Sequence, residues 1–278
     1  MTEIEDHDRG LDHDLPRLIS RRRAVGLLAG GLGSAFLAAC GGSAGESQTG
    51  AAGATPSATA TGSASATATA TAEEIPEETA GPFPGDGSNG PNVLAESGAV
   101  RRDITKSFGD ASGVAEGVPT TVELTLLDVA AGGTPLAGAA VYLWHCDMSG
   151  RYSLYDQSIA GENYLRGVQE SDRDGRLTFE TIFPSAYQGR WPHMHFEVYE
   201  SLDAAAAAGT KLRTSQLAVP KAICDEVFAT AGYEQSVQNL ARTSLETDMV
   251  FSDGYKSQLA SVSGSAADGV ALKLNVGV

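Results

Sequence analysis

Apolar and polar residues alternate with a period of two in the second half of the chain. Val122, Leu124 and Leu126 alternate with polar neighbours, which is typical of a strand with one buried face. Other short runs separated by turn residues predict further strands at 139–144, 176–182, 193–198, 213–219 and 271–276. Many short strands joined by turns indicate a mostly β fold, and we expect a β-sandwich.

Short helices and long loops are expected between these strands. Helical tendency is confined to the neighbourhoods of residues 202–208, 222–231 and 236–245. The segment between Gly150 and Gly175 is expected to form long loops. Loops of that length on a rigid scaffold commonly form binding sites, so this segment is a candidate for an active-site border.

The first forty residues have the character of an export signal. The arginine run Ser20–Arg23 precedes an apolar stretch, residues 24–39, that is too short to span a bilayer comfortably. The stretch closes in Leu37–Cys40, which is like a lipobox. We therefore expect residues 1–40 to be a twin-arginine signal peptide, cleaved before a lipidated Cys40 that tethers the protein to the outer face of the cell membrane. An ordinary secretion signal with an incidental cysteine is the alternative.

Residues 41–78 are expected to form a flexible linker. As far as residue 72 they are almost wholly Gly, Ala, Ser and Thr, and Glu46 is the one charged residue among them. Such a segment has too little apolar surface to bury, so burial cannot offset the conformational entropy that is lost when the chain is ordered. The remainder, residues 79–278, is long enough for one domain with a sizeable core.

The charge of the chain argues against a nucleic-acid partner. Nineteen Lys and Arg residues stand against 35 Asp and Glu residues, which gives a formal net charge of −16. An acidic surface repels phosphate backbones. The only membrane contact that the sequence predicts is the lipid anchor at Cys40.

Two cysteines remain outside the signal, Cys146 and Cys224. In an oxidising compartment a disulfide between them is a reasonable hypothesis. The alternative is a pair of buried free thiols, and the sequence alone does not give the separation of the two Cα atoms that would decide between them.

Two histidines, His193 and His195, stand one residue apart in a predicted strand. Side chains alternate between the faces of a strand, so both imidazoles project from one face while Met194 and Phe196 pack on the other. Two imidazoles on one rigid strand form a metal-ligand pair.

Tyrosines are the nearest groups that could complete the shell of an ion. His145 is the only other histidine after residue 40, and it lies far upstream. Tyr187 is close in sequence, and Tyr152 follows a predicted strand end. A phenolate is a hard anion that needs a strongly Lewis-acidic ion to form far below its usual pKa of about 10. Fe(III) is the natural match for such a set.

A series of short motifs runs in order through most of residues 79–255. The motifs are Thr79–Phe83, Arg102–Thr105, Trp144–His145, Gly150–Ser153, Leu165–Gly167, Asp172–Gly175, Ile182–Tyr187, Arg190, His193–His195 and Thr214–Leu217. Two tyrosines, an arginine and two histidines in this order are specific. In these motifs the chain resembles the intradiol ring-cleavage dioxygenases, with a core like that of catechol and protocatechuate dioxygenases, and particularly their secreted, lipoprotein-like members.

The resemblance implies a non-haem Fe(III) with four protein ligands. They are Tyr152, Tyr187, His193 and His195. In the family pattern Tyr187 and His195 form the axial pair. Tyr152 and His193 are then equatorial, beside a solvent ligand.

The resemblance also implies two further site residues. Arg190 takes the place of the family's active-site arginine, three residues before the first histidine. Gln216 matches a glutamine that lines the same pocket. The chain departs from the usual pattern at Ser185–Ala186 and at Trp191–Pro192, which would alter the shape of the pocket rather than the ligand set.

The reaction that the resemblance implies is cleavage of a catechol-type ring by O2 outside the cell. The substrate would bind through both oxygens and displace Tyr187, whose phenolate can accept a substrate proton. Arg190 would stabilise the charge that develops when dioxygen attacks a ring carbon. The product would be a muconate-type diacid that contains both oxygen atoms.

Two other interpretations fit part of the pattern. His193 and His195 followed by Glu200 are similar to a cupin metal motif, but that motif needs a further histidine, and none follows His195. A surface-anchored β-sandwich that binds aromatic ligands without turnover would keep the fold and need no iron. A tyrosinate–Fe(III) absorption band would distinguish the dioxygenase from both.

Overall fold

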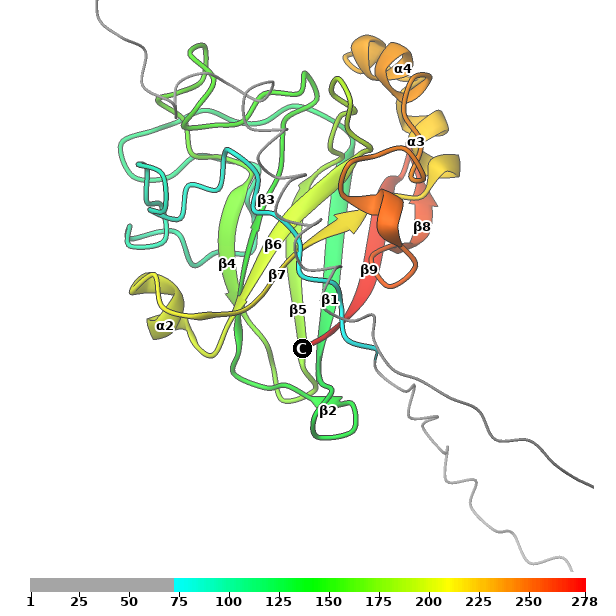
Figure 1. Cartoon of the computed structure of the whole chain (residues 1–278). Helices are drawn as coiled ribbons and strands as arrows, with labels where there is room; N and C mark the ends of the chain where they lie inside the picture. The colour runs from blue at the N-terminus through cyan, green and yellow to red at the C-terminus, as the bar shows by residue number, and fades with distance from the viewer. Residues whose placement is uncertain (1–72) are drawn as a thin grey trace, which may run out of the picture. The chain divides into compact units, whose positions relative to one another are not determined.

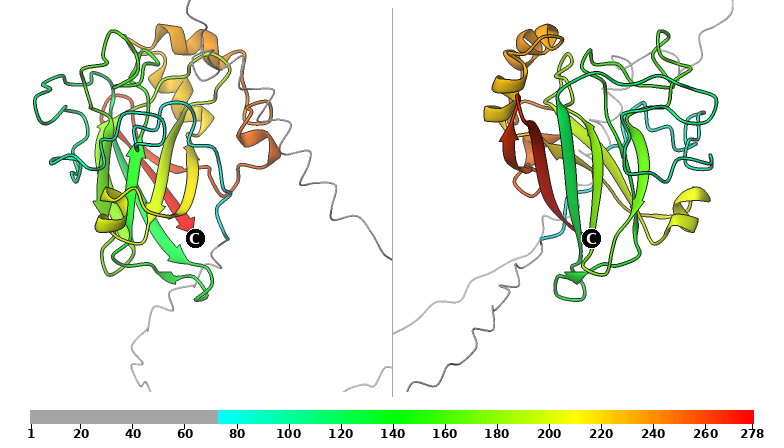
Figure 2. Two further views of the ribbon diagram at one scale, coloured as in Figure 1. Left: turned by 60° about the vertical axis from the view of Figure 1, so that its left-hand side comes forward. Right: turned by 180° about the vertical axis from the view of Figure 1, so that it is seen from behind.

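Two β-sheets pack face to face in the computed structural model, which describes residues 73–278 (Figures 1 and 2). The five-stranded sheet contains β1 (Pro119–Asp128), β2 (Thr134–Pro135), β5 (Arg176–Ile182), β8 (Ser261–Ser265) and β9 (Gly269–Gly277). The four-stranded sheet is antiparallel, in the order β4 (Arg166–Glu170), β3 (Ala140–Trp144), β6 (His193–Tyr199) and β7 (Lys211–Ala218). The helices are α2 (Leu202–Ala206), α3 (Lys221–Val227), α4 (Glu234–Leu240) and the 3-10 helix η2 (Phe251–Asp253).

The core lies between the two sheets. Val122, Leu124 and Leu126 of β1 are fully buried and share one apolar cluster with Leu143 of β3 and Phe196 of β6. Burying an aliphatic or aromatic side chain of this size contributes roughly 1.5–3 kcal/mol. The predicted β-sandwich with a few short helices is confirmed.

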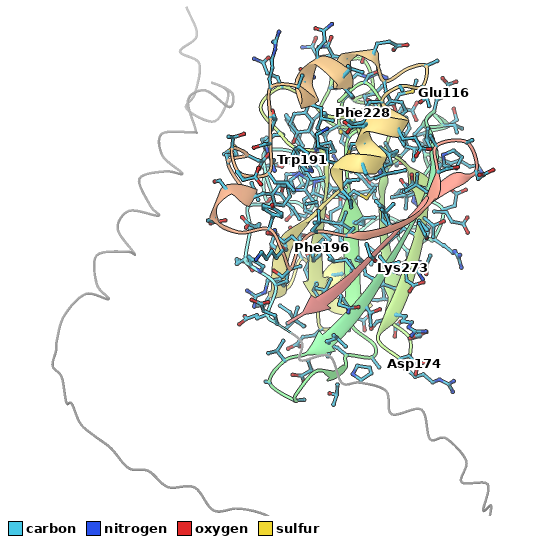
Figure 3. All side chains as sticks on the ribbon, turned by 90° about the vertical axis from the view of Figure 1, so that its right-hand side faces the viewer. Glu116, Asp174, Trp191, Phe196, Phe228 and Lys273 are labelled. Atoms are coloured by element: carbon cyan, nitrogen blue, oxygen red, sulfur yellow. The ribbon has the colours of Figure 1, made fainter. Side chains whose placement is uncertain are left out.

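The two ends of the sandwich differ in what lies beside them: helical segments at one end and turns at the other. In Figure 3, Trp191 and Phe228 lie at the end beside the helical segments, and Asp174 lies at the opposite end. Trp144 of β3 pairs with both Arg166 and His195, so β3 ends where β4 and β6 begin. The end that contains Trp191 therefore also receives the loops that follow β3 and precede β6.

Two strands lack a clear sequence signal. β4 lies inside the segment predicted to be loop between Gly150 and Gly175, so that prediction is wrong for residues 166–170. Its composition, with Gly and charged residues, shows no alternation, and the strand forms because it pairs with β3 over its whole length. β8 is serine-rich and mostly exposed, so it has no apolar face for a pattern to reveal.

The folded domain begins before residue 79. Residues 73–78 fall in the predicted linker, yet Ile75 is 1% exposed and its amide donates to the carbonyl of Gly277 at 3.0 Å. The amide of Glu78 donates to Thr214 on β7. A single apolar residue among Glu and Pro gives little sequence signal, so this boundary needs correction.

Residues 75–94, called the strap below, then cross the outer face of the four-stranded sheet (Figure 1). The predicted signal peptide, lipobox and most of the linker lie outside the described residues. Within residues 73–278 none of the helices has the length and apolar character needed to cross a membrane.

Cys146 and Cys224 are both buried free thiols, so the disulfide hypothesis is wrong. Cys146 packs with the side chains under the strap, whereas Cys224 on α3 belongs to the core between the sheets. Burial raises the pKa of the Cys146 thiol to about 11, and it also raises the pKa of Cys224.

Candidate metal centre

The two histidines of β6 lie on the outer face of the four-stranded sheet. His193 is 1% exposed and His195 is 2% exposed, while Met194 and Phe196 between and after them belong to the inner core. The alternation predicted for this strand is confirmed. The Nε2 atoms of the two imidazoles are 3.1 Å apart.

Two tyrosine hydroxyls meet these imidazoles. Tyr187, from the loop after β5, places its Oη 3.1 Å from His193 Nε2. Tyr152, from the loop after β3, places its Oη 3.4 Å from Tyr187 Oη, and its ring lies edge-on to His195 with the centroids 6.1 Å apart. Neighbouring ligand atoms on one ion, each at about 2 Å, stand roughly 3 Å apart. The four side chains therefore have the spacing of a common coordination sphere.

Neighbouring groups fix the orientation of both imidazoles. His193 Nδ1 lies within hydrogen-bonding distance of the carbonyl of Trp191. A carbonyl only accepts, so Nδ1 carries the proton and the lone pair of Nε2 faces the tyrosines. The ring of His195 stacks on Trp144 at 5.0 Å and 9°. Gly81 of the strap has φ +72°, and a Cβ there would lie 3.2 Å from His195 Cε1.

Burial decides the protonation of these groups. It raises the pKa of Tyr187 to about 12 and the pKa of Tyr152 well above its usual value. It lowers the pKa of His193 and His195 well below the usual value. Neutral imidazoles are ready to bind a metal, but ionising a phenol of pKa about 12 at neutral pH costs about 7 kcal/mol. Only a strongly Lewis-acidic ion offsets that cost, so the donor set fits Fe(III).

Arg190 and Gln216 lie beside this centre, bonded to each other. Arg190 is buried, and its Nη2 donates to Gln216 Oε1 at 2.6 Å. Gln216 in turn donates from Nε2 to the carbonyl of Thr79 in the strap. Burial opposes the charge of Arg190, but Tyr187 and Asp248 favour it, and the pKa of the guanidinium is raised overall. The structure thus brings all six predicted site residues together.

Arg166 ties the strap to the loop that carries Tyr152. Its guanidinium is buried and donates to the carbonyls of Phe83 and Pro84 in the strap and to the carbonyl and hydroxyl oxygens of Ser153. Phe83 packs its ring 5.2 Å from the ring of Tyr152. The sequence shows Arg166 only as part of a short motif and does not reveal this role. The role depends on bonds to residues more than eighty positions away, which only the fold brings close.

Asp248 is a second site residue that the sequence does not reveal. It lies between α4 and η2, is fully buried, and accepts from Arg190 Nε at 2.9 Å. A single Asp in a polar segment carries no local signal of such a pair.

The cupin ligand set is not present in the described part of the chain. Glu200 is exposed beyond the end of β6. Within residues 73–278 no three side chains of the His, Cys, Asp and Glu types gather as a metal site. The candidate centre depends on its tyrosines.

The chain is similar in sequence to known dioxygenases over part of its length. A family model described as Dioxygenase matches residues 89–212. Catechol 1,2-dioxygenase 1 of Acinetobacter lwoffii is 39% identical over 56 residues, which cover 20% of this chain and 18% of that protein. Chlorocatechol 1,2-dioxygenase of Rhodococcus opacus is 34% identical over 56 residues, with 20% and 22% covered. The matched segments thus span about a fifth of these curated relatives.

A solved structure covers much more of the chain. The intradiol ring-cleavage dioxygenase from Tetranychus urticae superposes with a TM-score of 0.58 and 25% identity, covering 74% of this chain and 94% of that one. The chain is thus similar to intradiol ring-cleavage dioxygenases in its fold, and residues 89–212 match a dioxygenase family model.

Proposed function

We propose that the protein uses Fe(III) and O2 to cleave a catechol-type ring between its two hydroxylated carbons, giving a muconate-type diacid. The observation that carries this proposal is the convergence of two phenols and two imidazoles at 3.1–3.4 Å spacings. The side chains that would hold the ion are Tyr152, Tyr187, His193 and His195.

The residues of the site have distinct tasks. When bound, Fe(III) would supply the Lewis acidity that ionises the phenols and activates the catechol toward dioxygen. Once ionised, Tyr187 Oη can accept a proton from a substrate hydroxyl, because Tyr187 is the less buried of the two phenols. Arg190 supplies a fixed positive charge beside the reacting ring. The strap limits the access of water.

We also propose that the enzyme acts outside the cell, held by a lipid at Cys40. This proposal depends on the arginine run, the apolar stretch and the lipobox-like sequence of residues 1–40. A Cys40→Ala variant should move from the membrane fraction to the soluble fraction of the exported protein. Retention in the membrane fraction would contradict lipidation.

The test of the reaction is absorption spectroscopy combined with oxygen uptake. The purified, iron-loaded protein should show a visible tyrosinate–Fe(III) band and consume one O2 for each catechol cleaved, with a ring-opened diacid as product. A panel of substituted catechols would identify the substrate. A colourless protein that binds catechols without oxygen uptake would instead support a binding module, and tightly held zinc or copper in active material would refute the iron site.

A further inference from the structure

Asp248 uses both of its carboxylate oxygens inside the protein. Oδ2 accepts from Arg190 Nε at 2.9 Å and from the backbone amide of Trp191 at 2.7 Å. Oδ1 accepts from the amides of Val250 at 2.8 Å and Phe251 at 3.2 Å. The side chain is 0% exposed. Asp248 therefore fastens the segment before β6 to the segment that begins η2.

This bonding fixes the direction of the Arg190 guanidinium. Asp248 binds Nε, and Gln216 binds Nη2 at 2.6 Å. The group is planar, so holding two of its nitrogens sets the direction of the third. Nη1 has no hydrogen-bond partner among residues 73–278, which leaves both of its N–H groups able to bind a ligand.

The same oxygen also steadies His193. Asp248 Oδ2 holds the amide of Trp191, and the carbonyl of Trp191 accepts from His193 Nδ1. One carboxylate thus restrains both the guanidinium and the residue whose carbonyl sets the tautomer of an imidazole.

We infer that Asp248 is a positioning residue for ring cleavage, which holds Arg190 Nη1 in place for the bound catechol. This inference rests on the proposed function. A neutral amide could not replace the carboxylate. Each carboxylate oxygen accepts from a pair of donors, Arg190 Nε with one backbone amide at Oδ2 and two backbone amides at Oδ1, whereas an Asn side chain has only one oxygen. Its NH2 group would face one of those pairs and leave it without an acceptor.

The decisive experiment is a double-mutant cycle on the full, iron-loaded protein. Asp248→Asn should lower kcat by about tenfold to a hundredfold, the range typical of residues that orient a metal site, while iron content and the visible band are largely kept. In an Arg190→Ala background, Asp248→Asn should have a much smaller effect on kcat, since only its bond to the amide of Trp191 is then left to act on the centre.

Asp147 offers a matched control. It is also a buried carboxylate that binds an arginine, Arg151 Nε at 2.9 Å, and accepts backbone amides from Ser149 and Arg151. It has no bond to Arg190. Asp147→Asn should therefore change kcat by the same factor in the wild type and in the Arg190→Ala background, whatever the size of that factor.

Two further measurements keep the inference testable if Asp248→Asn folds poorly. In metal-free protein, urea-unfolding cycles should show coupling between Asp248 and Arg190 and none between Asp147 and Arg190. Arg190→Lys should lose nearly as much kcat as Arg190→Ala, because a lysine cannot be held at two nitrogens while presenting a third.

The outcomes separate this inference from the proposed function. An active wild type in which Asp248→Asn costs the same in both backgrounds, or in which Arg190→Lys keeps wild-type turnover, overturns the role of Asp248 alone. A wild type that consumes no oxygen with any catechol overturns the proposed function and this inference with it.

Discussion

Tyr187 combines two properties that are seldom found in one tyrosine. Its hydroxyl lies within 3.4 Å of two other candidate ligand atoms, and burial raises its pKa to about 12. A buried phenol with such a pKa is inert in metal-free protein. A metal ion that ionises it would turn it into both a ligand and a proton acceptor.

Tyr187→Phe should therefore keep the fold but change the chemistry. We expect the visible band to shift or disappear and kcat to fall by about 10²–10⁴-fold, the usual contribution of acid–base groups. Absorption spectra and oxygen uptake measure both effects. Tyr255→Phe removes a hydroxyl that donates to Glu246 and to none of the candidate ligands, and it should change neither. An unchanged band and rate in Tyr187→Phe would remove this tyrosine from the ligand set.

His145 makes stability depend on pH in a direction that its burial determines. Its Nδ1 donates to the carbonyl of Cys146 and its Nε2 accepts from the hydroxyl of Thr181. Burial lowers the pKa of this imidazole to about 4, from a usual value of about 6.5. The folded state therefore binds fewer protons than the unfolded state between these values. The stabilisation is complete above pH 6.5 and is lost as the pH falls toward 4.

In metal-free protein the free energy of unfolding should fall by about 3 kcal/mol over this range through His145 alone. His193 and His195, whose pKa values burial also lowers, add to the fall. Urea unfolding of wild type and His145→Gln at pH 7 and pH 4 measures the difference. The variant should lose less stability on acidification, and an identical pH dependence would show that His145 does not titrate as described.

The strap is joined to the four-stranded sheet by ion pairs with buried carboxylates. Lys211 Nζ lies 2.6 Å from both Asp86 in the strap and Glu197 on β6. Burial raises the pKa of Glu197 despite that lysine, so Glu197 needs the cation to stay ionised. The ion pairs therefore hold the strap against the sheet that carries the histidines.

Lys211→Met should destabilise the protein by about 3 kcal/mol at neutral pH, because it leaves a buried carboxylate without its cation. The strap should also become more sensitive to limited proteolysis. Lys221→Met breaks an exposed pair with Asp225 and should cost less than about 0.5 kcal/mol. Equal unfolding curves for Lys211→Met and Lys221→Met would show that the strap is held by other contacts.

Strands were predictable from the sequence where only one of their two faces is buried, because their apolar and polar residues then alternate. β1, β5 and β9 alternate buried and less buried residues, and the pattern is visible without a structure. The histidines of β6, a strand buried along its whole length, were found from their spacing of two residues, and the tyrosines from their order relative to them. β4 and the first residues of the strap form through pairing with distant segments, which no local pattern records. β8 pairs with the neighbouring β9, but it is too exposed to show an apolar pattern. Asp248 belongs with β4 and the strap, since its partners are 57 and 58 residues away.

At the scale of the whole domain, the sandwich supports the site from one end. The candidate ligands come from the loop after β3, the loop after β5 and the start of β6, and the strap crosses over them. The segments are joined through the two sheets, so an ion that binds all of them should also stabilise the fold. An ion that binds only the native state adds about 4 kcal/mol at a thousandfold excess over its Kd.

Removal of the metal should therefore lower the thermal midpoint, and added Fe(III) should restore it. Differential scanning calorimetry of wild type before and after chelation measures the shift. A double variant, Tyr187→Phe with His193→Ala, should unfold at the same temperature with and without iron. A midpoint in wild type that does not respond to iron would contradict a site shared among these segments.

The contact between Ile75 and Gly277 has a mechanical consequence. The first described residues run beside the last residues of β9 and then cross the sheet above the histidines. A pulling force applied at residue 73 would thus break this short contact first and peel the covering segment away next. The centre would be uncovered while both sheets stayed intact, so we expect tension on that end of the chain to stop turnover well before it unravels the domain.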